Sequence, residues 1–149
     1  MVQQQTQGLD EAFDATIDAW LIERQALLTQ FVALPQMSVT DDLIQALHGL
    51  CEAMVDYSSR GHFNVYEQLL SHIKQYNEKH QQQAQLLLGK IHDTTDKIVI
   101  FDDEYGAVQK LTVQDVGHFN GRLSRLGEVL TERFNYEDQL MVLLQASLP

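Results

Sequence analysis

Hydrophobic positions recur at intervals of three and four along most of the chain, whereas strict alternation of apolar and polar residues is almost absent. Intervals of three and four place side chains on one face of an α-helix, while alternation is typical of a half-buried strand. The pattern therefore predicts an all-α protein. The first apolar stripe extends from about Leu9 to Leu34 and ends at Pro35, whose ring disfavours helix at the preceding residue.

A second helix is predicted after a short turn at residues 36–39. Thr40 or Ser38 can cap it, and two aspartates in its first turn suit the positive end of the helix dipole. Its apolar face comprises Leu43, Leu47, Leu50, Met54 and Tyr57. We expect this helix to end near Ser59, because Gly61 suits the position just past a helix end, where positive φ is common.

A shorter third helix is predicted next, with an apolar face of Phe63, Tyr66, Leu70 and Ile73. Residues 76–85 are polar and form either a loop or the polar start of the next helix. A fourth helix is indicated by apolar spacing from Leu87 to Phe101, and residues 105–113 are expected to form the longest loop.

The last helix begins where Thr112 can act as its N-cap, and its apolar positions continue to Leu144. Four long helices with short connections predict an antiparallel four-helix bundle, to which the third helix adds a short packing element. We expect a single helical-bundle domain over residues 1–149, in which residues 1–8 form a disordered tail.

The composition agrees with a folded domain and limits its chemistry. The chain has 149 residues, 44% of them hydrophobic, which is enough to bury a core. Cys51 is the only cysteine, so an intramolecular disulfide and cysteine-pair zinc sites are excluded. The polar start does not resemble a signal peptide, and no apolar stretch is long enough to cross a bilayer. We therefore expect a cytoplasmic protein without a membrane partner.

The net charge of −11 bears on the kind of partner. Direct binding to nucleic acid is disfavoured, because phosphate contacts need clustered lysine and arginine side chains. A basic protein partner is favoured, since opposite charges speed encounter and reject wrong partners. Residues 1–59 contain nine acidic residues and one basic residue, a net charge of −8, so the first two predicted helices carry most of the charge.

No motif points to catalysis, so we predict that the chain is not an enzyme and uses no cofactor or metal. Paired Glu-x-x-His motifs of di-iron bundles, phosphate-binding loops and nucleophile elbows are absent. The neighbouring acids Glu137 and Asp138 are interpreted as surface charge, and Cys51 as a packed side chain. Six histidines keep a metal- or ligand-binding helical bundle as an alternative hypothesis.

An acidic stripe on the second helix is the most informative surface feature. At 3.6 residues per turn, its members fall within about 60° of one another, on the side away from the apolar face. They are Asp41, Gln45, Glu52 and Asp56. Beyond the expected corner at Gly61 come His62, Phe63 and Tyr66. Acids beside aromatics suit binding to a basic partner helix, although Phe63 and Tyr66 can alternatively be core residues.

Three segments carry a family resemblance. Residues 56–67 follow the pattern Asp-Tyr-x-Ser-x-Gly-His-Phe-x-x-Tyr-Glu. Residues 17–25 contain an Asp-x-Trp-Leu-x-x-Arg run, and residues 130–140 contain a Glu-Arg-Phe-x-x-Glu-Asp-x-Leu run. Together, and in this order, they resemble the Rsd/AlgQ family of regulators of the primary sigma factor of RNA polymerase.

The resemblance implies a helical bundle that binds the C-terminal region 4 domain of the primary sigma factor. Such an anti-sigma regulator would keep this domain from core polymerase and the −35 promoter element, favouring alternative sigma factors. It also allows an adaptor for other cytoplasmic regulatory proteins, such as a phosphocarrier or an alarmone enzyme. By similarity Asp56 and Phe63 are expected to bind the partner, and neighbouring positions complete the predicted surface. These are Asp41, Gln45, Glu52, Ser59, Arg60, His62 and Tyr66.

Position 60 departs from the family pattern, in which it is usually small. Arg60 follows Asp56 by four residues, a spacing that permits an ion pair across one helical turn. Such a pair would divert Asp56 and reduce attraction to a basic partner.

Overall fold

The computed structural model describes residues 11–38 and 41–148, and this part of the chain is helical without strands. The elements are α2 (Glu11–Ala33), the 3-10 helix η1 (Leu34–Gln36), α3 (Asp41–Arg60), the π-helix η2 (Gly61–Tyr66), α4 (Glu67–Tyr76), α5 (Glu78–Tyr105) and α6 (Val113–Ser147). The prediction of an all-α protein is confirmed. The expected tail at residues 1–8, the helix start at Leu9 and the Thr40 cap lie outside the described residues.

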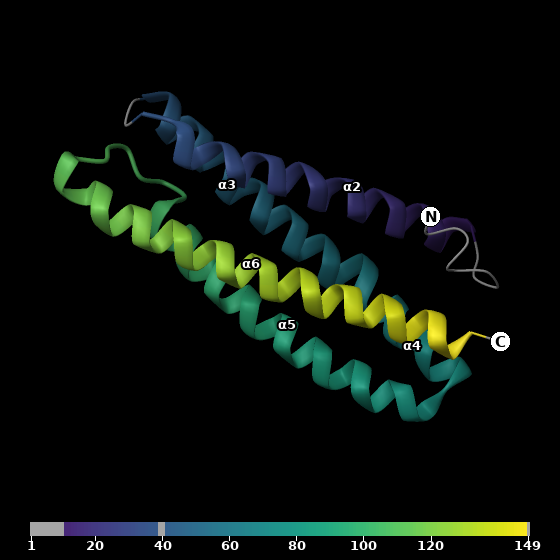
Figure 1. Cartoon of the computed structure of the whole chain (residues 1–149). Helices are drawn as coiled ribbons and strands as arrows, with labels where there is room; N and C mark the ends of the chain where they lie inside the picture. The colour runs from purple at the N-terminus through teal and green to yellow at the C-terminus, as the bar shows by residue number, and fades with distance from the viewer. Residues whose placement is uncertain (1–10, 39–40, 149) are drawn as a thin grey trace.

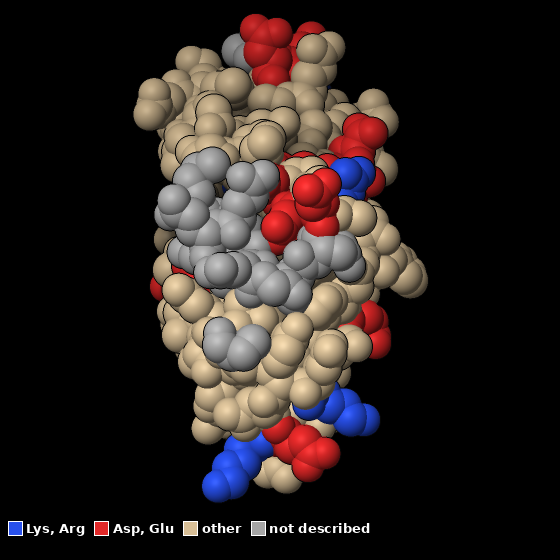
Figure 2. Space-filling view, turned by 90° about the vertical axis from the view of Figure 1, so that its right-hand side faces the viewer, with Lys and Arg blue, Asp and Glu red and all other residues tan. Residues whose placement is uncertain are grey.

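The long helices pack side by side as an antiparallel bundle, as predicted (Figure 1). Helix α3 lies against both α2 and α5, and α5 packs most extensively on α6. Helix α2 begins at the same end of the bundle at which α6 ends. Figure 2 looks onto this end, where uncharged side chains cover most of the visible described surface, with a few acidic and basic groups between them.

Aromatic side chains occupy the centre of the core. Trp20 is fully buried and stacks on Tyr57 with ring centroids 5.9 Å apart. The same indole meets the edge of the Tyr66 ring, also at 5.9 Å. Offset and edge-to-face contacts of this kind stabilise a core beyond the burial of area alone. The described part of α2 thus joins the core through the apolar stripe predicted from sequence.

The predicted helix break at Gly61 is wrong. Arg60 and Glu67 both have α-helical backbone angles, at φ −63° and ψ −40° and at φ −61° and ψ −42°. The chain therefore continues as one helical segment from α3 through η2 into α4. Glycine serves another purpose here, because a Cβ at Gly61 would lie 2.7 Å from the Tyr66 hydroxyl oxygen. It permits close approach of an aromatic ring and does not supply a positive φ.

Side-chain caps define the starts of the last two long helices. The Asn77 side chain accepts hydrogen bonds from two backbone amides of the first turn of α5. Because α5 begins at Glu78, most of the polar segment 76–85 is the start of a helix and not a loop. Thr112 caps α6, as predicted, and exchanges hydrogen bonds with Asp115 in a capping box. Among the described helices, none is both long and apolar enough to cross a membrane.

Candidate functional site

The acidic stripe faces solvent along α3. All four of its members, Asp41, Gln45, Glu52 and Asp56, are exposed. The apolar positions that repeat every three or four residues on the same helix, such as Leu47 and Leu50, have no accessible surface. The expected division of α3 into an acidic outer face and an apolar inner face is therefore confirmed.

Phe63 projects from the π-helix η2 and is 82% exposed. An aromatic side chain exposed to this degree is available for contact with a partner. It borders a hollow of about 300 Å³ between η2 and α5, lined by His62, Tyr66, Glu67, Leu88 and His92. Of the two alternatives for this residue, the exposed one applies.

Tyr66 is a core residue, so its predicted place on the partner-binding surface is wrong. Its ring is 2% exposed. Its hydroxyl donates a hydrogen bond to Glu137 and accepts one from Arg133 at 2.8 Å. Tyr66 and Phe63 both line the hollow beside η2.

Glu137 lies at the centre of a buried polar network, and its interpretation as surface charge is wrong. Its carboxylate has no exposed surface and accepts a hydrogen bond from Tyr57 at 2.6 Å. Arg133 Nε lies 3.3 Å from Glu137 Oε2, and Arg24 approaches the other oxygen to 3.8 Å. Its neighbour Asp138 is 52% exposed and pairs with Arg24 at 2.7 Å.

Burial raises the pKa of the Glu137 carboxyl, and the attraction of Arg133 and the two tyrosine hydrogen bonds oppose that rise. The same burial raises the pKa of Tyr57 and of Tyr66, and the nearby Glu137 charge adds to both shifts. Both phenols consequently stay protonated and act as donors to the carboxylate.

Arg133 connects this network to α5. The guanidinium, which is itself fully buried, donates to the hydroxyl oxygens of Thr94 at 3.1 Å and Thr95 at 2.6 Å. Thr95 also lies 3.0 Å from His62 Nε2, so the π-helix is tied to α5 through one shared hydroxyl. The His62 ring stacks on His92 with centroids 4.4 Å apart.

The π-helix explains how one carboxylate reaches both tyrosines. Tyr57 and Tyr66 are nine residues apart, which is two and a half turns of an α-helix at 3.6 residues per turn. An unbroken α-helix would therefore point them to opposite sides. A π-helix bonds residue i to i+5 and turns less per residue, so η2 brings the second phenol back toward Glu137.

Arg60 does not pair with Asp56, contrary to expectation. Its guanidinium lies 2.9 Å from Glu23 Oε1 and joins the end of α3 to α2. Asp56 makes no ion pair with any described residue and keeps its charge open to solvent. Ser59 is also exposed, while His62 is half-buried.

Sequence interpretation missed Arg24, Tyr57 and Arg133 as members of a polar centre. A signal was present, because Arg133 and Glu137 follow the apolar positions Leu126 and Leu130 by seven residues, the spacing of one helix face. Charged residues on an otherwise apolar face predict a buried pair.

Two further histidines make ring or hydrogen-bond contacts, and the cysteine is buried. His72 stacks on Phe13 at 4.7 Å, and His80 lies 2.8 Å from the Ser147 hydroxyl. Within residues 11–38 and 41–148, no three histidine, cysteine or acidic side chains gather as metal ligands. Burial, with a contribution from the Asp102 charge, raises the pKa of the Cys51 thiol to about 12, so the thiolate nucleophile is scarce at neutral pH.

His62 provides a prediction about acid stability. Burial, with repulsion from Arg133 and His92, lowers its pKa to about 4, from an ordinary value of about 6.5. Between these values the unfolded chain binds more protons than the folded one, so this histidine makes stability fall as the pH decreases. We expect the free energy of unfolding to fall more for the wild type than for His62→Gln when the pH is lowered from 7.5 to 4.5. Urea titration at both values measures it, and a constant difference would contradict it.

These features define the class as an acidic helical-bundle protein with an exposed face that is acidic along α3 and aromatic at η2. The family described as regulator of RNA polymerase sigma(70) subunit, Rsd/AlgQ, matches residues 1–145. The chain belongs to the Rsd/AlgQ family.

Curated relatives share most of the chain. The chain is 31% identical over 138 residues to the "Regulator of sigma D" of Pectobacterium carotovorum, covering 88% of each chain. It is 31% identical over 135 residues to the protein of the same name from Pectobacterium atrosepticum, covering 86% of each. With that of Yersinia enterocolitica it shares 29% identity over 130 residues, which is 84% of this chain and 77% of the relative. No solved structure matches the chain.

Proposed function

We propose that this protein is an anti-sigma regulator that binds the region 4 domain of the primary sigma factor. Bound there, it would keep the sigma factor from core RNA polymerase and from the −35 promoter element, favouring alternative sigma factors. Membership of the Rsd/AlgQ family and the printed names of its relatives support a sigma-factor partner. The action is binding without catalysis, and it belongs in the cytoplasm, where RNA polymerase works.

The acidic outer face of α3 is the observation that carries the choice of region 4. A helix-turn-helix domain presents basic side chains, because most of its contacts with DNA are to phosphates. The exposed carboxylates of Glu52 and Asp56 offer those side chains an alternative partner. Since the whole chain has a net charge of −11, its field also attracts a basic domain from a distance.

Phe63 adds an apolar contact to the charged surface. Exposed ion pairs contribute little free energy, whereas a large apolar side chain that enters a partner's pocket contributes much more. The proposed contact surface therefore consists of the acidic stripe and the exposed or half-buried positions around Phe63. These are Asp41, Gln45, Glu52, Asp56, Ser59, Arg60, His62 and Phe63.

The proposal is tested by binding of the isolated region 4 domain, followed by calorimetry or fluorescence anisotropy. Asp56→Ala is expected to weaken binding by about three- to tenfold, because it removes a charge that no described side chain neutralises. Affinity should also fall steeply between 0.05 and 0.5 M salt, since exposed charges are screened over about 10 Å at 0.1 M.

Asp103→Ala is the matched control, because it removes an exposed carboxylate from α5 and changes the net charge equally. It should leave the affinity nearly unchanged. Equal weakening by both variants would show a general charge effect and contradict the site. Failure of the wild-type protein to bind region 4 would overturn the proposal and favour an adaptor with another partner.

A further inference from the structure

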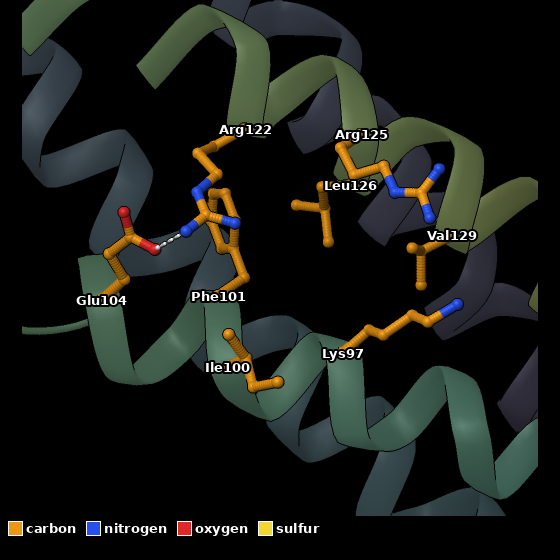
Figure 3. A pocket seen from close by; sticks show the side chains of 8 residues that line it. All are labelled: Lys97, Ile100, Phe101, Glu104, Arg122, Arg125, Leu126 and Val129. Atoms are coloured by element: carbon orange, nitrogen blue, oxygen red, sulfur yellow. Dashed lines mark ion pairs between the residues drawn. The ribbon is translucent and has the colours of Figure 1, made fainter. Parts of the chain in front are cut away.

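Two hollows lie between α5 and α6, and the surface that joins them is called the α5–α6 groove. The first has a volume of about 210 Å³ and is lined by Lys97, Ile100, Phe101, Glu104, Arg122, Arg125, Leu126 and Val129 (Figure 3). Phe101 and Leu126 lie between the two helices and Ile100 lies on α5 beside them, whereas the longer charged side chains extend from the walls. Ile100 is 57% exposed, so the hollow has an apolar floor open to water.

Three cations surround this floor in a chain that is otherwise strongly acidic. Arg122 pairs with Glu104 at 3.3 Å and Arg125 with Glu128 at 2.9 Å. Lys97 forms no ion pair with a described residue. Three cations and one acid, Glu104, line the hollow, so its lining has a net charge of +2 in a chain whose net charge is −11. An occupant that is both apolar and negatively charged complements it.

A second hollow lies further along the same groove. It has a volume of about 550 Å³ and is lined by Gln83, Leu86, Leu87, Lys90, Asn135, Asp138, Gln139, Val142 and Leu143. Leu86 is 71% exposed and Val142 64% exposed. Leu86 and Ile100 are fourteen residues apart on α5, which corresponds to about 21 Å at 1.5 Å per residue. Exposed apolar groups in a line of this length are typical of an interaction surface.

The dimensions favour a helix over a compact ligand. Pockets for small organic molecules usually enclose about 300–1,000 Å³, and the basic hollow is smaller than that range. It has room for one bulky side chain. Two hollows about 21 Å apart match residues fourteen positions apart on a helix, which return to nearly the same face after two heptads.

We propose that the groove between α5 and α6 binds an amphipathic, acidic helix of a second protein partner. One apolar side chain of that helix enters the hollow at Ile100, and its flanking carboxylates pair with Lys97 and Arg125. A second apolar side chain, fourteen residues away, lies against Leu86 and Val142. This is the helix-in-groove mode of recognition, with charge at one end fixing the direction of the bound helix. The surface is separate from the acidic stripe of α3, which attracts a basic partner.

A synthetic helical peptide of 22 residues tests the surface, with two leucines fourteen positions apart and four glutamates around the first. Binding to the full chain is followed by fluorescence anisotropy of the labelled peptide. Lys97→Glu with Arg125→Glu should weaken binding at least tenfold. The matched control is Lys74→Glu with Lys79→Glu, which reverses the same number of exposed charges elsewhere and should change binding less than twofold.

Two further variants test the apolar part of the proposal. Ile100→Ser and Leu86→Ser each remove an exposed apolar anchor, so the fold is expected to persist while peptide affinity falls about fivefold. A peptide whose second leucine is moved two positions should lose affinity to the same degree. Circular dichroism confirms that each variant remains helical.

The outcomes separate this proposal from its competitors. The proposal would be overturned if Lys97→Glu with Arg125→Glu and the control Lys74→Glu with Lys79→Glu lost peptide affinity equally. It would also be overturned if the wild type did not bind the peptide. Binding of the wild-type chain to anionic lipid vesicles through the same rim, in the absence of peptide binding, would also overturn it and indicate a membrane surface. The Lys97→Glu with Arg125→Glu variant should not weaken region 4 binding, because it makes the chain more acidic, so the two proposed surfaces fail or succeed independently.

Discussion

Replacing Glu137 with alanine is expected to lower the free energy of unfolding by about 3–5 kcal/mol, because it leaves a buried guanidinium without its counter-charge. The side chains of Arg133 and Glu137 are both completely buried, with Nε and Oε2 3.3 Å apart. The substitution also removes the acceptor of two tyrosine hydroxyls, which burial prevents from bonding to water. Urea denaturation followed by circular dichroism measures the change.

Three variants locate the origin of this loss. Glu132→Ala removes an exposed acid from the same helix and should change stability by less than about 0.5 kcal/mol. Glu137→Gln keeps the shape and one hydrogen-bond acceptor, so an intermediate loss is expected. Arg133→Met combined with Glu137→Leu removes both charges together and should recover much of the stability lost in Glu137→Ala. A double variant no more stable than Glu137→Ala would contradict the interpretation as an uncompensated charge.

The second large effect is expected at the surface. Phe63→Ala should weaken binding of the region 4 domain by about 2 kcal/mol or roughly 30-fold, because exposed aromatics that enter a partner's pocket carry much of the binding free energy. The stability of the free protein should hardly change, since this ring is 82% exposed before binding. Calorimetric titration of the isolated domain, with a thermal melt of the variant alone, measures both quantities.

Val113→Ala is the control for loss of exposed apolar surface, because Val113 is 89% exposed at the start of α6 and lies outside the proposed contact surface. It should bind region 4 as the wild type does. If Phe63→Ala retained full affinity while Asp56→Ala did not, the contact would be electrostatic alone. If neither variant mattered, the partner would bind elsewhere on the chain.

The buried network and the exposed face are mechanically related. Asp56 immediately precedes Tyr57, and Phe63 lies between His62 and the buried Tyr66 on the π-helix. Hydrogen bonds from both tyrosines to Glu137 fix the two ends of this surface relative to each other. These hydrogen bonds hold the Tyr57 and Tyr66 side chains in one arrangement, which reduces the ordering cost of binding.

Most helices, and the buried faces of α3, α5 and α6, could be predicted from the sequence alone. Apolar spacing depends on local helix geometry, so the stripe ending in Tyr57 and the exposed acids opposite it could be predicted residue by residue. Caps are equally local, and the Thr112 cap of α6 was predictable because its partner Asp115 is three residues away. The three family motifs extended the prediction to a partner class.

Three features could be known only from the tertiary structure, because they depend on contacts between side chains: the continuous helix at Gly61, the burial of Glu137 and the partner of Arg60. Gly61 is a residue type common at helix ends, yet the chain stays helical there, and the Tyr66 ring occupies the space that a Cβ at position 61 would need. Because Glu137 is followed by Asp138, the sequence predicted an exposed acid at this position. Its burial is compensated by Arg133 and by two phenols from another helical segment. Arg60 pairs with Glu23 on α2 instead of its near neighbour on α3. The two tyrosines that bond to Glu137 and the Glu23 partner of Arg60 are distant in sequence, and only the folded arrangement brings them within bonding distance.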